Sequence, residues 1–437
     1  MFALMAVVFV LGYLAIALEH PIRVNKAASA IFTGAVIWGL LMVFHDTILP
    51  GADGDTHHLV EELRHHLGEI AEILFFLIGA MTVVELIDVH GGFRVITDRI
   101  TSTKKSTLLW IISVLTFFLS AALDNLTTTI VMCALLRKLI KDKETLWLFA
   151  GMVIISANAG GAWSPIGDVT TIMLWIGGQV TSLNIIAKLI LPSLVCMILP
   201  LLWMTFTQKG NVERPDVVRS SGGHGGKITG FERNLVFGLG VGSLLFVPVF
   251  KSVTHLPPYV GIMFGLGLLW IVTEVMHWRH GADDRGDLMV TAVLRRIDMP
   301  SVLFFLGILV AVAALQTAGH LTLLAGWLDS SLGNIYLING TIGVLSAIVD
   351  NVPLVAAAMG MYPMTQYPVD DIFWELLALC AGTGGSLLVI GSAAGVAAMG
   401  ILRIDFIWYL RKMMLPALLG YLGGILTFLL MWGSGGH

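Results

Sequence analysis

The sequence predicts an all-α polytopic membrane protein made of inverted repeats, with two re-entrant hairpins, two broken helices and about ten spans. Three observations predict this fold class. First, 57% of the 437 residues are hydrophobic and 12% are charged, which is about half the charged fraction of an ordinary soluble domain. Second, long apolar runs alternate with clusters of charge. Third, motifs of the first half of the chain return in the second half.

Composition also excludes several classes of protein. The hydrophobic fraction corresponds to about 249 residues, enough for about twelve spans of about 20 residues each. So few charges exclude a soluble globular enzyme, a disordered chain and a nucleic-acid-binding protein. Runs that stay apolar throughout argue against the alternating strands of an outer-membrane barrel. Cys133, Cys196 and Cys380 lie in apolar runs, so we expect them to pack rather than to form disulfides.

Twelve apolar runs mark the candidate membrane segments. The first run has neither a basic n-region nor a small-residue cleavage site, so we expect a retained span rather than a signal peptide. The runs cover residues 1–18, 27–44, 70–90, 107–136, 146–180, 184–208, 234–250, 258–277, 299–318, 335–362, 372–400 and 405–432.

Four of these runs are interrupted by polar or glycine-rich sequence. Three of the interruptions contain an acidic residue, Asp124, Asp168 or Asp350, and the fourth lies between Gly382 and Gly395. Backbone that is not helical is tolerated inside a membrane only where it is buried in protein or lines a cavity. The interruptions therefore indicate where a site is built.

Basic residues predict the orientation of the chain. Loops rich in Lys and Arg stay on the cytoplasmic side, and the acidic, histidine-rich segment 45–69 is expected outside. Of the 25 basic residues, 22 fall into six clusters, at 23–26, 94–105, 137–143, 209–233, 279–296 and 403–412.

This orientation predicts which runs cross the membrane. Run 107–136 has basic clusters at both ends, which predicts a hairpin that enters from the cytoplasm with Asp124 at its tip. Run 335–362 has none, which predicts a hairpin that enters from outside with Asp350 at its tip. Runs 146–180 and 372–400 then cross as broken helices.

The two halves of the chain carry matching motifs. Leu74–Leu77 matches Leu303–Leu306, and Ser120–Asn125 matches Ser346–Asn351. Glycines 160, 161 and 167 match glycines 384, 385 and 391 in the same order and at nearly constant offset. Repeat one, residues 70–208, begins outside and repeat two, residues 299–437, begins inside. Inverted repeats with discontinuous helices are typical of secondary transporters, which bind their substrate between the repeats and work by alternating access.

Asp124, Asp168 and Asp350 are the deepest acidic residues, and no Lys or Arg lies in their own segments. An unpaired carboxylate in a membrane is costly and indicates function. Hydroxyl and amide oxygens, which hard cations prefer, surround them in sequence: Ser120, Thr127, Asn158, Thr170 and Ser346. Such a carboxylate can hold a proton or a metal cation but not both, which is the minimal chemistry of a cation/proton exchanger. The plainer alternative is that each aspartate only caps a helix.

Four segments resemble the NhaD-type sodium/proton antiporters of the ion transporter superfamily. They are Ser120–Thr129, Ser156–Thr171, Ser346–Val355 and Ala381–Ser392. The resemblance implies a homodimeric, multi-pass protein of the bacterial inner membrane that exchanges Na⁺ or Li⁺ for H⁺ without a cofactor. It also implies a scaffold, here residues 1–69 and 209–298, and a transport domain that moves like an elevator.

The same resemblance implies a set of residues that serve the ion. Asp124 and Asp168 are expected to bind Na⁺ or Li⁺. Ser392 stands where repeat one has Asp168, so one asymmetric site is expected rather than two equivalent sites. The full set of expected ion- and proton-binding residues is Ser120, Asp124, Asn125, Thr127, Asn158, Asp168, Thr170, Ser346, Asp350 and Asn351.

Other functions fit the sequence less well. A sodium-coupled carrier of dicarboxylates or oxyanions would hold its anion at helix N-termini and would be expected to have neutral residues where this chain has Asp. Opposed hairpins argue against a passive channel. An enzyme is disfavoured because the sequence contains no nucleophile–base pair and no His/Cys metal cluster. Membrane lipid and a second copy of the chain are the expected partners, and nucleic acid is not.

Overall fold

The computed structural model describes residues 1–17, 19–48, 56–97, 99–215, 228–278, 288–348, 350–389 and 391–433. Regular structure in these ranges is helical, which confirms the predicted all-α class. The basic residues Arg219, Lys227, Arg279 and Arg285, which helped to predict orientation, lie outside the described residues.

The helices follow the predicted order of segments. The N-terminal part forms α1 (Phe2–Ala17), α2 (Glu19–Ile22), α3 (Lys26–Val43), α4 (His45–Ile48), α5 (Thr56–Val89) and α6 (Arg94–Thr97). Repeat one continues with α7 (Lys105–Leu123), α8 (Asn125–Leu139), α9 (Lys143–Ala162), α10 (Val169–Ile176) and α11 (Ser182–Thr207). The connecting helices are α12 (Gly230–Thr254), α13 (Pro258–His277) and α15 (Val290–Val293). Repeat two forms α16 (Met299–Thr317), α17 (His320–Leu332), α18 (Ile335–Leu345), α19 (Asn351–Met361), α20 (Ile372–Gly384), α21 (Ala393–Leu402), α22 (Phe406–Lys412) and α23 (Met414–Trp432).

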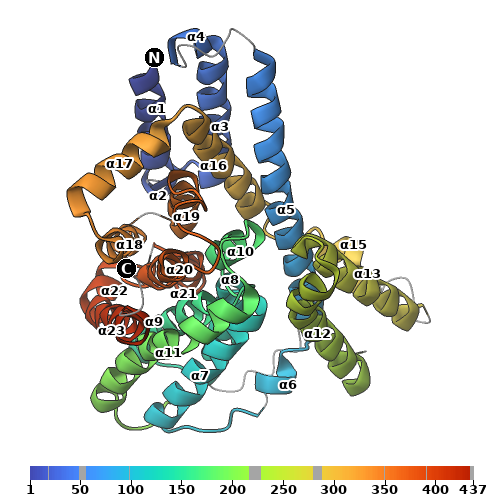
Figure 1. Cartoon of the computed structure of the whole chain (residues 1–437). Helices are drawn as coiled ribbons and strands as arrows, with labels where there is room; N and C mark the ends of the chain where they lie inside the picture. The colour runs from blue at the N-terminus through green and yellow to red at the C-terminus, as the bar shows by residue number, and fades with distance from the viewer. Residues whose placement is uncertain are drawn as a thin grey trace.

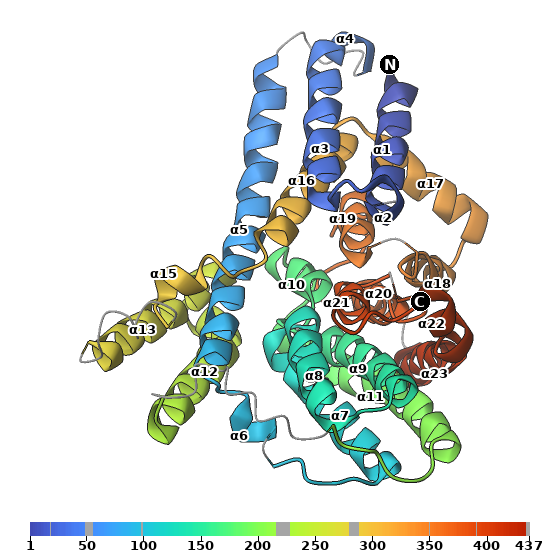
Figure 2. The same cartoon turned by 180° about the vertical axis from the view of Figure 1, so that it is seen from behind.

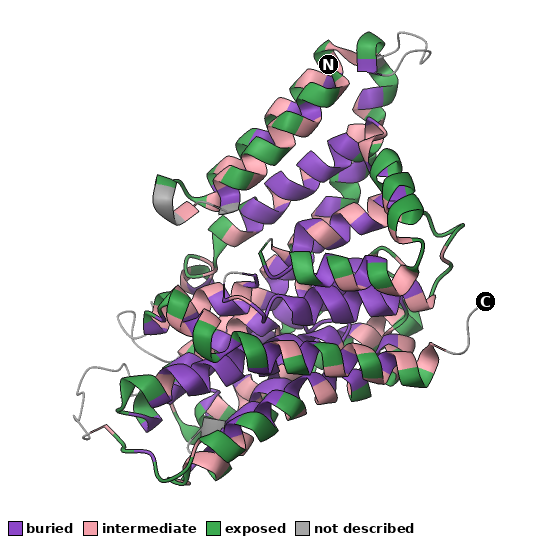
Figure 3. Cartoon of the chain, turned by 90° about the vertical axis from the view of Figure 1, so that its left-hand side faces the viewer, coloured by how far each residue is buried: buried purple, intermediate pink, exposed green. Residues whose placement is uncertain are grey.

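The helices pack into two bundles and a pair (Figures 1 and 2). Helix α3 runs along α16, with α1 and α5 beside them. Helices α7, α9, α11, α20 and α23 form the second bundle, and α12 and α13 pair with each other against α5. The short helices α10 and α19 contact each other between the two bundles. Buried residues concentrate inside the bundles, while the outer helices keep an exposed face (Figure 3).

Nine helices in the described residues are long and apolar enough to cross a membrane, and the bent pair α21–α22 would make ten. This agrees with the predicted count of about ten. The nine are α3, α5, α7, α9, α11, α12, α13, α16 and α23.

Individual segments differ from the sequence-based map. The first run forms a helix of 16 residues, shorter than a typical span. Helix α9 is continuous over 20 residues, so the break in run 146–180 follows a complete span rather than dividing one in half. Helix α7 has 19 residues and the length of a span by itself. It therefore stays a prediction that runs 107–136 and 335–362 stop inside the membrane.

Several of the basic segments meet at one end of the second bundle. The amide of Lys105 donates to Gly210, and the amide of Lys141 donates to Glu213. These bonds hold the start of α7 and the end of α8 against one strip of chain, so the backbone reverses direction at Asp124. Lys412 forms an ion pair with Glu144 at 3.5 Å on the same end. The gathering of positive charge is what a cytoplasmic face requires.

Glycines let the interrupted helices approach each other in both repeats. A Cβ on Gly160 would lie 2.1 Å from the carbonyl oxygen of Phe117, and a Cβ on Gly384 would lie 2.0 Å from that of Gly343. Phe117 and Gly343 occupy equivalent positions of the two repeats. The same backbone contact therefore forms twice, between α7 and α9 and between α18 and α20, as expected for a true structural repeat.

Gly160→Ala is expected to destabilise the protein by about 1–3 kcal/mol, because the new methyl group has no room beside the α7 backbone. Gly400→Ala is the matched control, since nothing lies within 4 Å of the Cβ position there. Thermal unfolding of the detergent-solubilised proteins measures the difference. Equal transition temperatures for the two variants would contradict the close approach of α7 and α9.

Candidate ion-binding site

Asp168 lies at the centre of the site, at the break between α9 and α10. It is 2% exposed. Its Oδ1 accepts a hydrogen bond from the amide of Thr170 at 3.1 Å and so caps α10. Its Oδ2 accepts from Nδ2 of Asn125 at 2.7 Å and, more weakly, from Nδ2 of Asn351 at 3.5 Å. One oxygen therefore serves the backbone and the other faces two amides from opposite repeats.

Asn158 extends this network into repeat two. Its Oδ1 accepts from Asn125 at 3.1 Å, and its Nδ2 donates to the hydroxyls of Ser386 and Ser392 at 2.9 Å each. All these residues are buried. The predicted residues Asn125, Asn158, Asp168 and Asn351 are thus brought together across the two repeats, and Ser392 joins the same network instead of forming a second one.

Hydroxyl groups near the network have no hydrogen-bond partner in the described part of the chain. They include Thr170, next to the Asp168 break, and Thr128 and Thr129 on α8. Thr128 and Thr129 follow Asn125 by three and four residues, which puts them on its side of the helix. Buried hydroxyls are normally hydrogen-bonded. Their spare oxygen atoms are suited to a hard cation.

The side chains of the site are one carboxylate together with neutral amides and hydroxyls. Among the described residues, His, Cys, Asp and Glu nowhere gather in groups of three that could hold a metal ion. Carboxylate, amide and hydroxyl oxygens are the ligands that hard cations prefer. Within the described residues, Asp168 forms no ion pair with a basic side chain.

Asp124 lies at the turn between α7 and α8, and its side-chain hydrogen bonds go to Thr127 rather than to this network. Its Oδ1 accepts from the amide of Thr127 at 2.6 Å, and its Oδ2 accepts from the Thr127 hydroxyl at 2.8 Å. The residue is half-buried, with a φ of 126°. Oδ1 of Asp124 therefore caps α8, and Oδ2 is held by the Thr127 hydroxyl.

Asp350 has a basic partner that its own segment did not reveal. Its Oδ2 lies 3.7 Å from Nζ of Lys26, the first residue of α3. Its Oδ1 accepts from the amide of Val352 at 3.3 Å and caps α19. The expectation that all three aspartates lack a basic partner is therefore wrong for Asp350, because the partner comes from a helix 324 residues away in sequence.

Ser120 and Ser346 make equivalent contacts with the backbone. Ser120 donates its hydroxyl to the carbonyl of Ala157 at 2.6 Å, and Ser346 donates to that of Ala381 at 2.8 Å. Each hydroxyl therefore joins the helix before a break to its neighbouring helix. Helix α7 ends at Leu123 and α18 ends at Leu345, so neither serine lies on one continuous helix with the aspartate that follows it four residues later. That the serines serve the ion stays a prediction.

Three residues that contact the predicted set were missing from it: Ser386, Ser392 and Lys26. Ser392 aligns with Asp168 but is not among the expected ion-binding residues. Ser386 directly follows the glycine pair of repeat two and accepts a hydrogen bond from Asn158. Its position beside that motif could have identified it from the sequence. Lys26 had no comparable signal, because its contact with Asp350 arises only from packing. All four breaks share one design, in which the first helical residue is preceded by a side-chain cap: Asp124, Asp168, Asp350 and Ser392.

Sequence comparisons agree with this description. The family model described as citrate transporter (CitMHS) matches residues 3–382. The chain is 49% identical over 427 residues to sodium/proton antiporter 1 of Arabidopsis thaliana, an alignment that covers 97% of this chain and 72% of the relative. Sodium/proton antiporter 2 of the same plant is 45% identical, with 97% and 98% covered. The Na⁺/H⁺ antiporter NhaD of Vibrio cholerae is 30% identical, with 97% and 90% covered.

These relatives are transporters of the membrane and not enzymes, which confirms the non-enzymatic, multi-pass character inferred from composition. The alignments span nearly the whole chain and include all four interrupted segments. The chain belongs to the citrate transporter (CitMHS) family and, within it, to the NhaD-type sodium/proton antiporters.

Proposed function

We propose that the protein exchanges Na⁺, or Li⁺, for H⁺ across a membrane at one site centred on Asp168. One observation carries the proposal. The Asp168 carboxylate is buried, and among the described residues its hydrogen-bond partners are neutral amides. A buried charge without a charged partner is costly. Either a proton or a small cation removes that cost, and the two compete for the same oxygen.

The amides are suited to both states of the carboxylate. When the site holds no cation, Asn125 and Asn351 present their N–H groups to Asp168 Oδ2. An amide also has a carbonyl oxygen, so rotation of either side chain would present an oxygen to a cation at the same place. Together with Asn158 Oδ1 and the Thr170 hydroxyl, these atoms would replace the hydration shell of Na⁺.

A sodium-coupled anion carrier is the second candidate, since the matching family model bears the description citrate transporter. An anion would bind where helix N-termini supply positive potential. At α8, α10 and α19 that position already holds a carboxylate, from Asp124, Asp168 and Asp350. These acidic caps would repel an anion, so we favour cation exchange.

We further propose that transport proceeds by alternating access with an elevator-like movement. The site lies between residues of the two repeats, as such a movement requires. The helices of residues 1–69 and 209–298 would form the scaffold and the surface of a homodimer. The relatives include proteins from a plant and from bacteria, and a bacterial inner membrane remains the location we propose.

Asp168→Asn should reduce sodium-dependent proton movement to background, because Asn keeps the cap of α10 but cannot exchange a proton for a cation. The assay uses purified protein in liposomes with a trapped pH-sensitive dye, to which Na⁺, Li⁺ or K⁺ is added. Asp142→Asn is the matched control, since Asp142 caps α9 through Thr145 at 2.8 Å far from the site. A fully active Asp168→Asn variant would refute the assignment.

Asp124→Asn should lower the exchange rate by about tenfold or more, because it removes a negative charge next to Asn125, which contacts Asp168. The cap of α8 survives, since Asn is as good a cap as Asp. The same liposome assay and a thermal unfolding curve separate the two effects. Loss of stability with normal exchange would instead show that Asp124 is only a cap.

Competition at one carboxylate predicts a specific pH dependence. Protons occupy more of the site as the pH falls, so the apparent KM for Na⁺ should rise by up to about tenfold per pH unit on the acid side. The maximal rate at saturating Na⁺ should change far less. Initial rates at several Na⁺ concentrations between pH 6 and pH 9 test this. A KM that stays constant over that range would require separate sites for Na⁺ and H⁺.

A further inference from the structure

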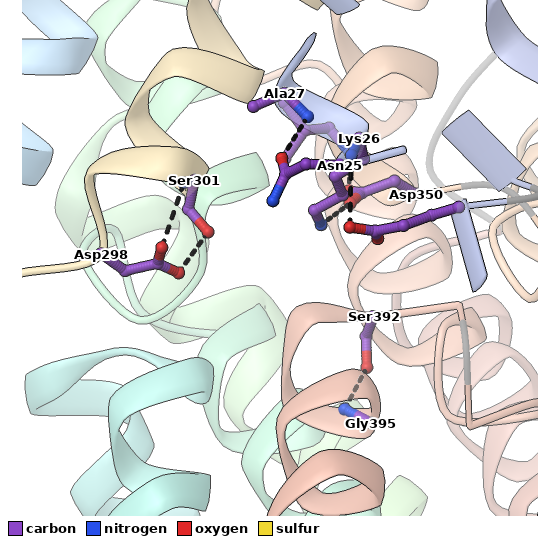
Figure 4. Close-up of polar contacts among 10 residues, drawn as sticks. Asn25, Lys26, Ala27, Asp298, Ser301, Asp350, Ser392 and Gly395 are labelled. Atoms are coloured by element: carbon purple, nitrogen blue, oxygen red, sulfur yellow. Dashed lines mark hydrogen bonds and ion pairs between the residues drawn. The ribbon is translucent and has the colours of Figure 1, made fainter. Parts of the chain in front are cut away.

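The ion pair of Lys26 and Asp350 joins two parts of the molecule that are far apart in sequence. Lys26 begins α3, and Asp350 caps α19 in repeat two. Their side chains are 23% and 17% exposed, and Nζ of Lys26 also lies 4.4 Å above the ring of Phe304. Figure 4 shows the ammonium group pointing at the Asp350 carboxylate from the neighbouring helix. The lysine is thus held by a carboxylate and an aromatic face.

This pair is connected to the exchange site by a single residue. Asn351 follows Asp350 at the start of α19, and its amide reaches Oδ2 of Asp168. A shift in Asp350 therefore moves the amide that contacts the exchanging carboxylate. Because only Asn351 lies between the two carboxylates, an uncompensated charge on Asp350 would also act on Asp168 through space. Both routes make the ionic state of Asp350 matter at the site.

A cavity of about 470 Å³ lies beside the pair. Lys26 lines it, and so do Leu126 and Ala393, which are the next residues after Asn125 and Ser392. The lysine of the pair therefore borders a cavity whose wall continues into the helices that carry Asn125 and Ser392. The other titratable groups around the pair are Tyr13 of α1, Glu19 of α2 and Asp298 at the start of α16.

We propose that Lys26 is a positioning residue whose ammonium group neutralises Asp350, so that Asp350 shapes the exchange site without binding the transported cation. This inference rests on the proposed function. Two uncompensated carboxylates close to each other disfavour ionisation of both. A fixed ammonium group at Asp350 leaves Asp168 free to alternate between its proton and its cation. Direct coordination of the cation by Asp350 would instead require Lys26 to leave in every cycle.

The two roles predict different behaviour for single and double variants. Lys26→Met leaves an unpaired negative charge near Asp168, which holds its proton more tightly, so half-maximal exchange moves to higher pH. Asp350→Asn leaves an unpaired positive charge, so half-maximal exchange moves to lower pH and the KM for Na⁺ rises. Each shift should be at least about 0.5 pH unit at protein-like dielectric. Lys26→Arg keeps the charge and should behave like the original protein.

The deciding experiment is the double variant Lys26→Met with Asp350→Asn, measured in liposomes across pH 6–9. If the lysine only compensates the aspartate, removing both charges should restore the rate to within about threefold of the original protein and return the pH profile. If Asp350→Asn and the double variant are both inactive although folded, Asp350 is a direct ligand and the inference is wrong. Lys412→Met is the matched control, because it breaks an exposed ion pair with Glu144 and should shift nothing.

Failure of the proposed function would be visible separately. In that case the original protein shows no sodium-dependent proton movement at any pH. The compensation can then still be measured by thermal unfolding, in which each single variant should lower the transition temperature and the double variant should recover it. Additive losses of stability in the double variant would contradict the pairing of Lys26 with Asp350.

Discussion

The structure depends on the placement of one buried carboxylate at a helix terminus. Among the described residues, no basic side chain forms an ion pair with it. Asp168 is that carboxylate, and it divides its two oxygens between tasks. One oxygen caps α10, and the other accepts from amides of Asn125 and Asn351. The first bond holds the carboxylate in place without neutralising it. The second set of bonds pairs the carboxylate with neutral groups only, which leaves its charge uncompensated by any basic side chain of the described residues.

The surrounding helices keep this carboxylate in position. Ser120 and Ser346 tie the helices before each break to the adjacent backbone, and the glycines at 160 and 384 bring those helices into direct contact. Equivalent contacts therefore form in both repeats, between α7 and α9 and between α18 and α20. The asymmetry lies in the caps, because repeat one has Asp168 where repeat two has Ser392. One carboxylate at the centre, rather than two, avoids repulsion between like charges in a medium of low dielectric.

Much of the fold was predictable, and each success has a physical reason. A low charged fraction and apolar runs of span length required a membrane protein, because no soluble fold buries so much apolar surface. Paired motifs at constant offset identified the repeats, since equivalent backbone contacts need equivalent glycines and serines. The first run was located correctly, but its helix of 16 residues is shorter than a typical span. Run 146–180 is broken where expected, but α9 is already of span length when it ends at Ala162, so the break does not divide it into two halves.

The sequence by itself determined the class of protein, the breaks in its helices and the short list of polar residues beside them, because these follow from composition and local spacing. Only the tertiary structure decided which of those residues meet. It brought Asn125, Asn158, Asp168 and Asn351 into one network, turned Asp124 toward Thr127, and gave Asp350 a partner in Lys26. Contacts between residues hundreds of positions apart depend on how helices cross, and no local pattern in the chain records that geometry.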